Sequence, residues 1–189
     1  QMIPKSLRNK LKINNDDSTE RDISSAALRF LYLSAKDSNI DFPKELVTLD
    51  DAYEVFMREG LSREEAKGIT YALVFSSKEK EERAVTRKLQ SNERFRDSED
   101  FKMRMPHFFE ALDAYKSIHE APHLPLFEKE TQFTRKVIRR CLDREMPILP
   151  IHDSYITQRN REEDFVEILN QSQQELYDDL NPLRFSKEY

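Results

Sequence analysis

The chain has 189 residues, a length that fits one domain or two small lobes that share a core. Charged residues make up 35% of it and hydrophobic residues 38%, and no apolar run approaches the ~20 residues that a membrane-spanning helix needs. The formal net charge of −5 argues against a protein whose whole surface binds nucleic acid, because such proteins are usually basic.

Two scarce residue types exclude several kinds of site. Cys141 is the single cysteine, so a disulfide framework or a cysteine-based zinc site within one chain is excluded, and a reducing, cytoplasmic setting is expected. Gly60 and Gly68 are the only glycines, which excludes the clustered glycines of a P-loop or a Rossmann fingerprint. The first ten residues lack the apolar core of a secretion signal, so none is expected.

The first predicted elements are a hairpin and a helix. Apolar residues alternate on either side of the polar run 14–17, which favours a β-hairpin over residues 10–24. The apolar spacing over 26–36 predicts a helix, and a loop is expected over 37–48.

Helices dominate the rest of the chain. They are predicted over residues 49–59, 63–75, 78–102, 107–119, 127–144 and 161–180. Ser62 is a good N-cap for the second of these, with Glu65 at the capping-box position. A loop is expected over 122–125, and residues 147–158 indicate two short strands around His152 and Asp153. Hairpins mixed with helices, and too few strands for a doubly wound sheet, predict an α+β fold with a small antiparallel sheet backed by helices.

Asp22 stands at the end of a predicted strand, just before a helix. A carboxylate held at the end of a strand is well placed to bind Mg²⁺, which prefers oxygen ligands. The alternative is an ordinary turn or N-cap aspartate.

A stripe of four residues follows on the helix predicted over 63–75: Arg63, Lys67, Tyr71 and Phe75. Their spacing of four places them along one helix face. Two cations followed by two aromatic rings suit a nucleoside triphosphate, whose phosphates need positive charge and whose base needs a flat apolar partner. The alternative is a surface helix with solvated cations and with both aromatic residues in the core.

His152 and Asp153 form a polar pair at the tip of the second predicted hairpin. They are explained either by a simple turn or by a second carboxylate for a metal site.

In this order, the three segments resemble the polymerase motifs of the family-A DNA polymerases and of the related single-subunit phage-type RNA polymerases. DISSAALR resembles the first motif, REEAKGITYALVFS the fingers helix and PIHDSYI the palm hairpin. The chain also resembles uncharacterised phage- and plasmid-borne proteins that pair such a segment with a PxHDS hairpin. The resemblance extends over residues 11–156.

The resemblance implies a single domain in which a palm-like sheet carries a helical, fingers-like insertion. Palm-like residues would be 1–36 and 120–189, and the fingers-like helices would be 49–118. The thumb of such enzymes precedes the first motif, and only 21 residues precede Asp22. The resemblance therefore implies one of three things: a fragment, a reduced polymerase core, or a protein to which a further domain or subunit supplies the thumb.

The resemblance also implies roles for individual residues. Asp22 and Asp153 would hold two Mg²⁺ ions, for which Mn²⁺ can substitute, and Lys67 would join them as a catalytic residue. The nucleotide would contact Arg63, Lys67, Tyr71, Phe75 and Ala27. Primer and template would contact His152, Arg135, Arg139 and Arg140. Arg29 would add positive charge beside the phosphates.

Two departures from the DNA-making relatives, and one from the phage-type RNA polymerases, bear on the sugar of the substrate. Ala27 replaces a glutamate that blocks the ribose hydroxyl, and Ser154 follows Asp153 as in the phage-type RNA polymerases. Phe75, however, lacks the hydroxyl with which those enzymes prefer ribose. We therefore expect weak sugar discrimination that leans towards ribonucleotides.

The leading hypothesis is a template-dependent nucleotidyltransferase, primase-like or RNA-polymerase-like, acting on nucleoside triphosphates and a DNA or RNA primer–template, with no membrane partner. A second hypothesis is a catalytically inert palm-like module that binds nucleic acid or a partner within a larger replication protein. A third is a metal-dependent nuclease that uses the same aspartates, which would leave the stripe at 63–75 unexplained.

Overall fold

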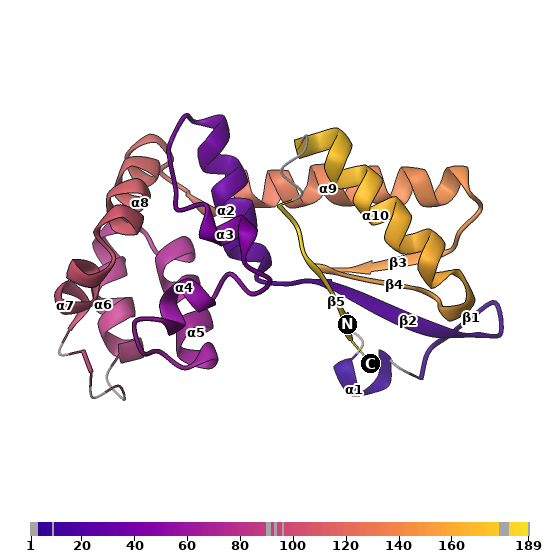
Figure 1. Ribbon diagram of the computed structural model, residues 1–189, viewed down its shortest axis with the longest axis horizontal. Coiled ribbons are helices and arrows are strands. Elements are labelled where there is room, and N and C mark those ends of the chain that lie inside the picture. The colour runs from indigo at the N-terminus through magenta and orange to yellow at the C-terminus, as the bar shows by residue number, and fades with distance from the viewer. Residues whose placement is uncertain are drawn as a thin grey trace. The chain divides into compact units, whose positions relative to one another are not determined.

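The structure, a computed structural model, describes residues 4–8, 10–89, 92, 94–95, 97–177 and 182–188. The chain divides into two compact units, Gln1–Ala26 with Glu130–Tyr189, and Ala27–Lys129. The predicted α+β class is confirmed, because a small antiparallel sheet is backed by helices (Figure 1).

The first unit contains the sheet. Its strands are β1 (Lys12–Ile13), β2 (Asp16–Ile23), β3 (Ile148–Ile151), β4 (Ser154–Gln158) and β5 (Phe185–Glu188). They follow the order β1-β2-β4-β3, with β5 paired to β2, and every pairing is antiparallel. Strand β2 therefore pairs with β1, β4 and β5, and β3 joins the sheet through β4.

Both predicted hairpins form, and each turns through two residues. Asn14 and Asn15 take φ values of 53° and 70°, which suits the two-residue turn of a tight hairpin because asparagine tolerates the left-handed region. The second turn has a positive φ of 54° at His152. The sequence did not predict β5.

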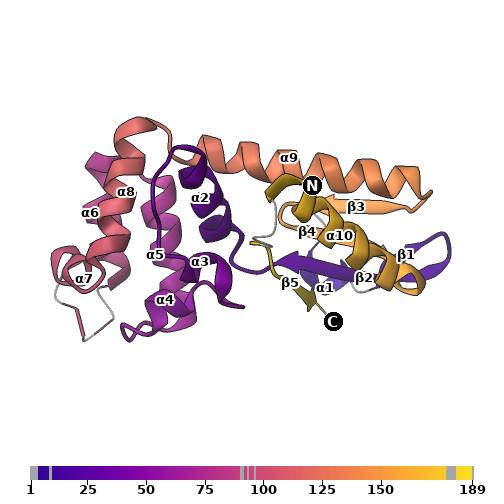
Figure 2. The ribbon, with the colours of Figure 1, turned by 45° about the horizontal axis from the view of Figure 1, so that its top comes forward.

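Helices cover one face of this sheet. The helix α10 (Glu162–Tyr177) and residues 130–143 of α9 (His123–Asp143) lie over it in both views (Figures 1 and 2). The buried Tyr155 ring of β4 contacts Phe133 of α9 and Phe165 of α10. Because side chains alternate along a strand, Asp22 and Ser154 point to the other face. A 3₁₀ turn, η1 (Arg159–Arg161), leads from β4 into α10, and a short helix, α1 (Lys5–Arg8), precedes β1.

The second unit is helical. It holds nearly all of α2 (Ala26–Asp37), then α3 (Glu45–Thr48), α4 (Glu54–Met57), α5 (Arg63–Phe75), α6 (Lys78–Leu89), α7 (Ser98–Arg104), α8 (Pro106–Ile118) and the first turns of α9. Its core is rich in aromatic rings that meet edge to face, a favourable geometry for such pairs. Phe108, for example, lies 5.5 Å from Phe42 and 5.1 Å from Phe56, centroid to centroid.

Several predicted boundaries were wrong. The expected loop over 37–48 contains α3, and the helix expected over 49–59 is reduced to α4. The charge-rich segment 78–102 forms two helices, because Asp97 caps a new one by accepting a hydrogen bond from the Asp100 amide. Residues 122–125 are not all loop, since α9 begins at His123 and tolerates a proline in its first turn. The end predicted for the last helix falls at residues outside the described ones.

Candidate active site

The register of β2 and β4 brings two of the predicted motifs together. Asp22 lies directly opposite Ser154, and the Ser154 hydroxyl donates a 3.0 Å hydrogen bond to Asp22 Oδ1. One position further, the Ile23 amide donates a 2.9 Å hydrogen bond to the carbonyl of Asp153. The two aspartates, which are distant in sequence, therefore lie at the same end of neighbouring strands.

The β3–β4 turn consists of His152 and Asp153. A positive φ at the first of two turn residues is a hairpin geometry that usually selects glycine, so the histidine is held in a less favoured conformation. His152 is exposed, whereas Asp153 is half-buried. The turn thus presents an imidazole to solvent and keeps the carboxylate close to the sheet.

A third carboxylate, which the sequence analysis missed, lies near this turn. Burial raises the pKa of Glu130, and the negative charge of Asp153 raises it further, while His152 acts in the opposite direction. Glu130 belongs to the stripe that α9 turns towards the sheet, because Phe133 and Val137 on the same face are fully buried. Glu130 lies three residues before Phe133 and seven before Val137, and this helical spacing is the sequence signal that could have identified it.

Thr134 lies one helical turn after Glu130 on α9, and its hydroxyl is 2.8 Å from the hydroxyl of the buried Tyr155. Burial raises the pKa of Tyr155 well above its usual value, and the hydrogen bond with Thr134 opposes that shift. Tyr155 therefore stays neutral at physiological pH and links α9 to β4.

Asp22 and Asp153 offer the oxygen ligands that Mg²⁺ prefers. Among the described residues, no group of three or more histidine, cysteine, aspartate or glutamate side chains is arranged to hold a metal ion. Magnesium sites that bind substrate phosphates commonly use only one or two protein carboxylates, so two half-buried aspartates, one on β2 and one in the adjoining β3–β4 turn, fit such a site.

The predicted nucleotide-binding stripe lies in the second unit, on α5. All four of its residues are exposed: Arg63, Lys67, Tyr71 and Phe75. The opposite face of α5 is buried, with Ala66, Ile69 and Leu73 fully enclosed. The alternative in which both aromatic residues are core residues is therefore wrong.

The capping box predicted at the start of α5 is present. Ser62 Oγ accepts a hydrogen bond from the Glu65 amide, and the Glu65 carboxylate accepts a 2.7 Å hydrogen bond from the Ser62 amide. The hydrogen bonds that the Glu65 carboxylate accepts from the Ser62 amide and from the Ser62 hydroxyl lower the pKa of Glu65. The box determines where α5 begins and so which residues share the exposed stripe.

The two cations of the stripe differ in their surroundings. Arg63 donates a 2.7 Å hydrogen bond to Asp51, which raises the pKa of the guanidinium, and it lies 5.4 Å from the centroid of the Tyr53 ring. Lys67 forms no ion pair with any residue that the structure describes. Lys67 is therefore the more available of the two for an anionic ligand.

Ala27, the other predicted nucleotide contact, is half-buried in the first turn of α2.

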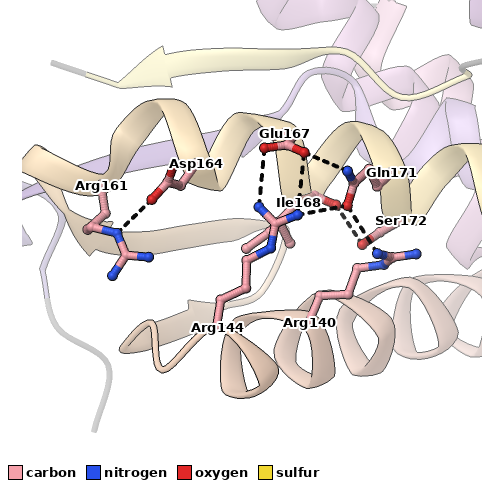
Figure 3. A network of polar contacts seen from close by, with 8 residues as sticks. All are labelled: Arg140, Arg144, Arg161, Asp164, Glu167, Ile168, Gln171 and Ser172. Carbon is pink, nitrogen blue, oxygen red and sulfur yellow. Dashed lines mark hydrogen bonds and ion pairs between the residues drawn. The ribbon is translucent and has the colours of Figure 1, made fainter.

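The predicted primer–template arginines on α9 fall into two groups. Arg135 and Arg139 are exposed and have no ion-pair partner within the described part of the chain. Arg140 instead faces α10, where it donates a 3.1 Å hydrogen bond to Gln171 and a 2.6 Å one to Glu175. Figure 3 shows Arg140 of α9, and Arg144 just after the end of this helix, reaching towards α10. Arg140 thus contributes to the packing of these helices.

The expectation for Arg29 was wrong. Its side chain is fully buried, with 0% exposure, and so cannot add charge beside a bound phosphate. Its guanidinium donates hydrogen bonds to backbone carbonyls after α2, the shortest being 2.7 Å to Leu49 and 2.8 Å to Asp50. Arg29 holds the segment that contains α3.

Comparison with known proteins gave no assignment: no family model matches the chain, and no similar protein was found among the curated ones. None of the helices that the structure describes is both long and apolar enough to pass through a membrane.

Proposed function

We propose that the chain is a template-dependent nucleotidyltransferase that uses two-metal phosphoryl transfer. The observation that carries the proposal is the β2–β4 register, which places Asp22 opposite Ser154 and joins Ile23 to Asp153. Two carboxylates held at the same end of neighbouring antiparallel strands, one on β2 and one in the turn before β4, are what such a reaction needs from its protein scaffold. Further support comes from α5, whose cations and aromatic rings share one exposed face.

Asp22 and Asp153 would hold the magnesium ions. When bound, these ions would lower the barrier by neutralising the charge that develops during phosphoryl transfer. Ser154, by donating to one oxygen of Asp22, would orient the other oxygen as a ligand. Its role is therefore one of positioning.

The nucleoside triphosphate would bind along α5. Lys67 would contact the phosphates, and Arg63 would support it after giving up part of its contact with Asp51. Tyr71 and Phe75, whose rings stack 5.4 Å apart, would contact the base and sugar. The small side chain of Ala27 leaves room for a ribose hydroxyl, so ribonucleotides are the preferred substrates in this proposal.

A DNA or RNA primer–template is the second substrate. Arg135 and Arg139 would contact its backbone, with His152 at the primer end. Since the net charge is −5, the chain by itself should bind this duplex weakly, and more weakly as the salt concentration rises. A further domain or subunit that acts as a thumb would strengthen binding, and the cytoplasm is the proposed location.

The test is extension of a labelled primer in the presence of Mg²⁺. Wild-type protein is compared with Asp22→Asn and Asp153→Asn, and with Asp143→Asn as a matched control, because Asp143 is an exposed aspartate of the same unit. We expect both site variants to lose extension and the control to keep it.

Three other outcomes would overturn the proposal. Extension that survives both site substitutions would remove the aspartates from the reaction. Binding of primer–template without any extension would favour the inert module. Strand cleavage that needs the aspartates but no nucleotide would favour the nuclease.

A further inference from the structure

Four aromatic rings form a continuous cluster on the surface of the second unit. Tyr71 and Phe75 of α5 stack with centroids 5.4 Å apart. Phe75 in turn lies 6.0 Å from His123 and 5.9 Å from Phe127, both in the first turns of α9, and these last two are 5.8 Å apart. We call these four residues the ring cluster. It joins two helices that are separated by nearly fifty residues of sequence.

The ring cluster faces solvent. Tyr71 is 47% exposed, Phe75 38% and Phe127 46%, while His123 is half-buried. Large aromatic side chains gathered in an exposed patch commonly mark a binding surface, because leaving them in water gives up the free energy of burying them. The ring cluster is therefore suited to bind a ligand with flat apolar surfaces.

The charge beside the ring cluster indicates what this ligand is. Lys67 stands one helical turn before Tyr71 on the same stripe, is exposed, and is unpaired among the described residues. Arg63 continues the positive charge one turn further. A line of cations that ends in a set of exposed rings matches a nucleic-acid strand, whose phosphates need cations and whose unpaired bases stack on aromatic side chains.

We infer that His123 and Phe127 extend the stripe of α5 into a stacking platform for the unpaired bases of a single-stranded nucleic acid. The choice of nucleic acid over other flat ligands rests on the proposed function. The inference goes beyond it in two respects: it assigns residues of α9, and it concerns a strand, with several bases, and not one nucleotide.

The test measures strand binding without catalysis. A fluorescent single-stranded oligonucleotide is titrated with protein, with no Mg²⁺ and no nucleotide, and binding is followed by anisotropy. We expect Phe127→Ala to weaken binding on the order of tenfold, the usual effect of losing one stacked base, and Phe127→Tyr to retain it. Leu124→Ala is the matched control, because Leu124 is a 58% exposed apolar residue of the same helix without a ring.

A second oligonucleotide of equal length and charge, but with abasic sites, separates stacking from charge. The platform requires wild-type protein to bind it much more weakly than the normal strand, and Phe127→Ala to show a smaller difference between the two strands, because one ring of the cluster is gone and three remain. Equal wild-type affinity for both strands would overturn the inference. So would a concentration-dependent dimer that Phe127→Ala abolishes, since a second copy would then be the occupant.

The outcome is distinguishable from failure of the proposed function. Base-dependent strand binding by a chain that never extends a primer would leave the platform in place and reject the polymerase. Primer extension by a chain whose Phe127→Ala variant binds strands normally would support the polymerase and reject the platform. Thermal unfolding of each variant checks that an exposed substitution has not changed the fold.

Discussion

Asp22 is flanked by a serine on each side: Ser154 of β4 lies opposite it in one ladder, and Ser186 of β5 lies opposite it in the other. The two serines are not equivalent. The buried Ser154 hydroxyl donates to the Asp22 carboxylate at 3.0 Å, whereas the exposed Ser186 hydroxyl makes a long 3.5 Å contact with the Asp22 backbone carbonyl. Of these two serines, Ser154 is therefore the one placed to orient the carboxylate.

This difference predicts the effects of two matched substitutions. Ser154→Ala removes a hydrogen bond to a charged group and should lower the free energy of unfolding by about 1.5–3 kcal/mol. Ser186→Ala should change it by less than about 0.5 kcal/mol. Urea denaturation followed by circular dichroism measures both. Equal effects of the two substitutions would show that the Ser154 hydrogen bond does not stabilise the fold.

Arg29 should be among the residues most important for the stability of the second unit. Arg29→Met leaves several backbone carbonyls without their donor, each at a cost of about 1–3 kcal/mol if it stays buried, so we expect a loss of at least about 3 kcal/mol. Arg58 is the control, because its ion pair with Glu54 is exposed and 3.9 Å long. Arg58→Met should cost less than about 0.5 kcal/mol. A variant Arg29→Met that unfolds at the wild-type urea concentration contradicts this role.

The capping box of α5 makes the stability of the second unit depend on pH. Hydrogen bonds from Ser62 lower the pKa of Glu65 in the folded protein below the value of 4.5 for an unperturbed glutamate. A carboxylate whose folded pKa is lowered stabilises the fold above its unfolded pKa, and this contribution disappears as the pH falls through the folded pKa.

We therefore expect Glu65→Gln to destabilise the protein at pH 7 and to approach wild-type stability in acid, below the usual glutamate pKa. Glu64→Gln, at the neighbouring exposed position of the same first turn, is the matched control for the loss of one glutamate charge. Urea midpoints measured across this pH range test both variants. Ser62→Ala, which removes the other half of the box, should cost about 1 kcal/mol at pH 7. A pH-independent difference between Glu65→Gln and wild type would argue against the lowered pKa.

Cys141 should be inert in the folded protein. Burial raises the pKa of its thiol to about 11, so almost no thiolate exists at pH 8, and the sulfur is enclosed. A thiol reagent at pH 8 should modify native protein very slowly and urea-unfolded protein rapidly, with one equivalent per chain. Rapid modification of the native protein would show that α9 opens locally around this residue.

Much of the fold could be predicted because its signals are local. The Ser62 and Glu65 box sets the start of α5, and the two asparagines at 14 and 15 set the first hairpin, since each depends on residues a few positions apart. The motifs also placed Asp22 on a strand and Asp153 at the tip of a hairpin, and the structure pairs β2 with β4, the strand that follows this tip. The sequence did not predict that 78–102 divides into two helices, because a cap at Asp97 interrupts a continuous pattern of charges. It also did not predict that α9 begins at His123, because a proline lies in the first turn.

The sequence by itself determined the α+β class, the two hairpins and the four-residue stripe on α5, because periodicity and turn chemistry act within a few residues. Only the tertiary structure decided three further features: the burial of Arg29 among carbonyls, the place of Glu130 beside Asp153, and the exposure of Tyr71 and Phe75 next to His123 and Phe127. Each depends on which distant segments pack together. An arginine in a helix has the same local sequence whether it meets water or buried carbonyls, so its role follows from packing and not from pattern.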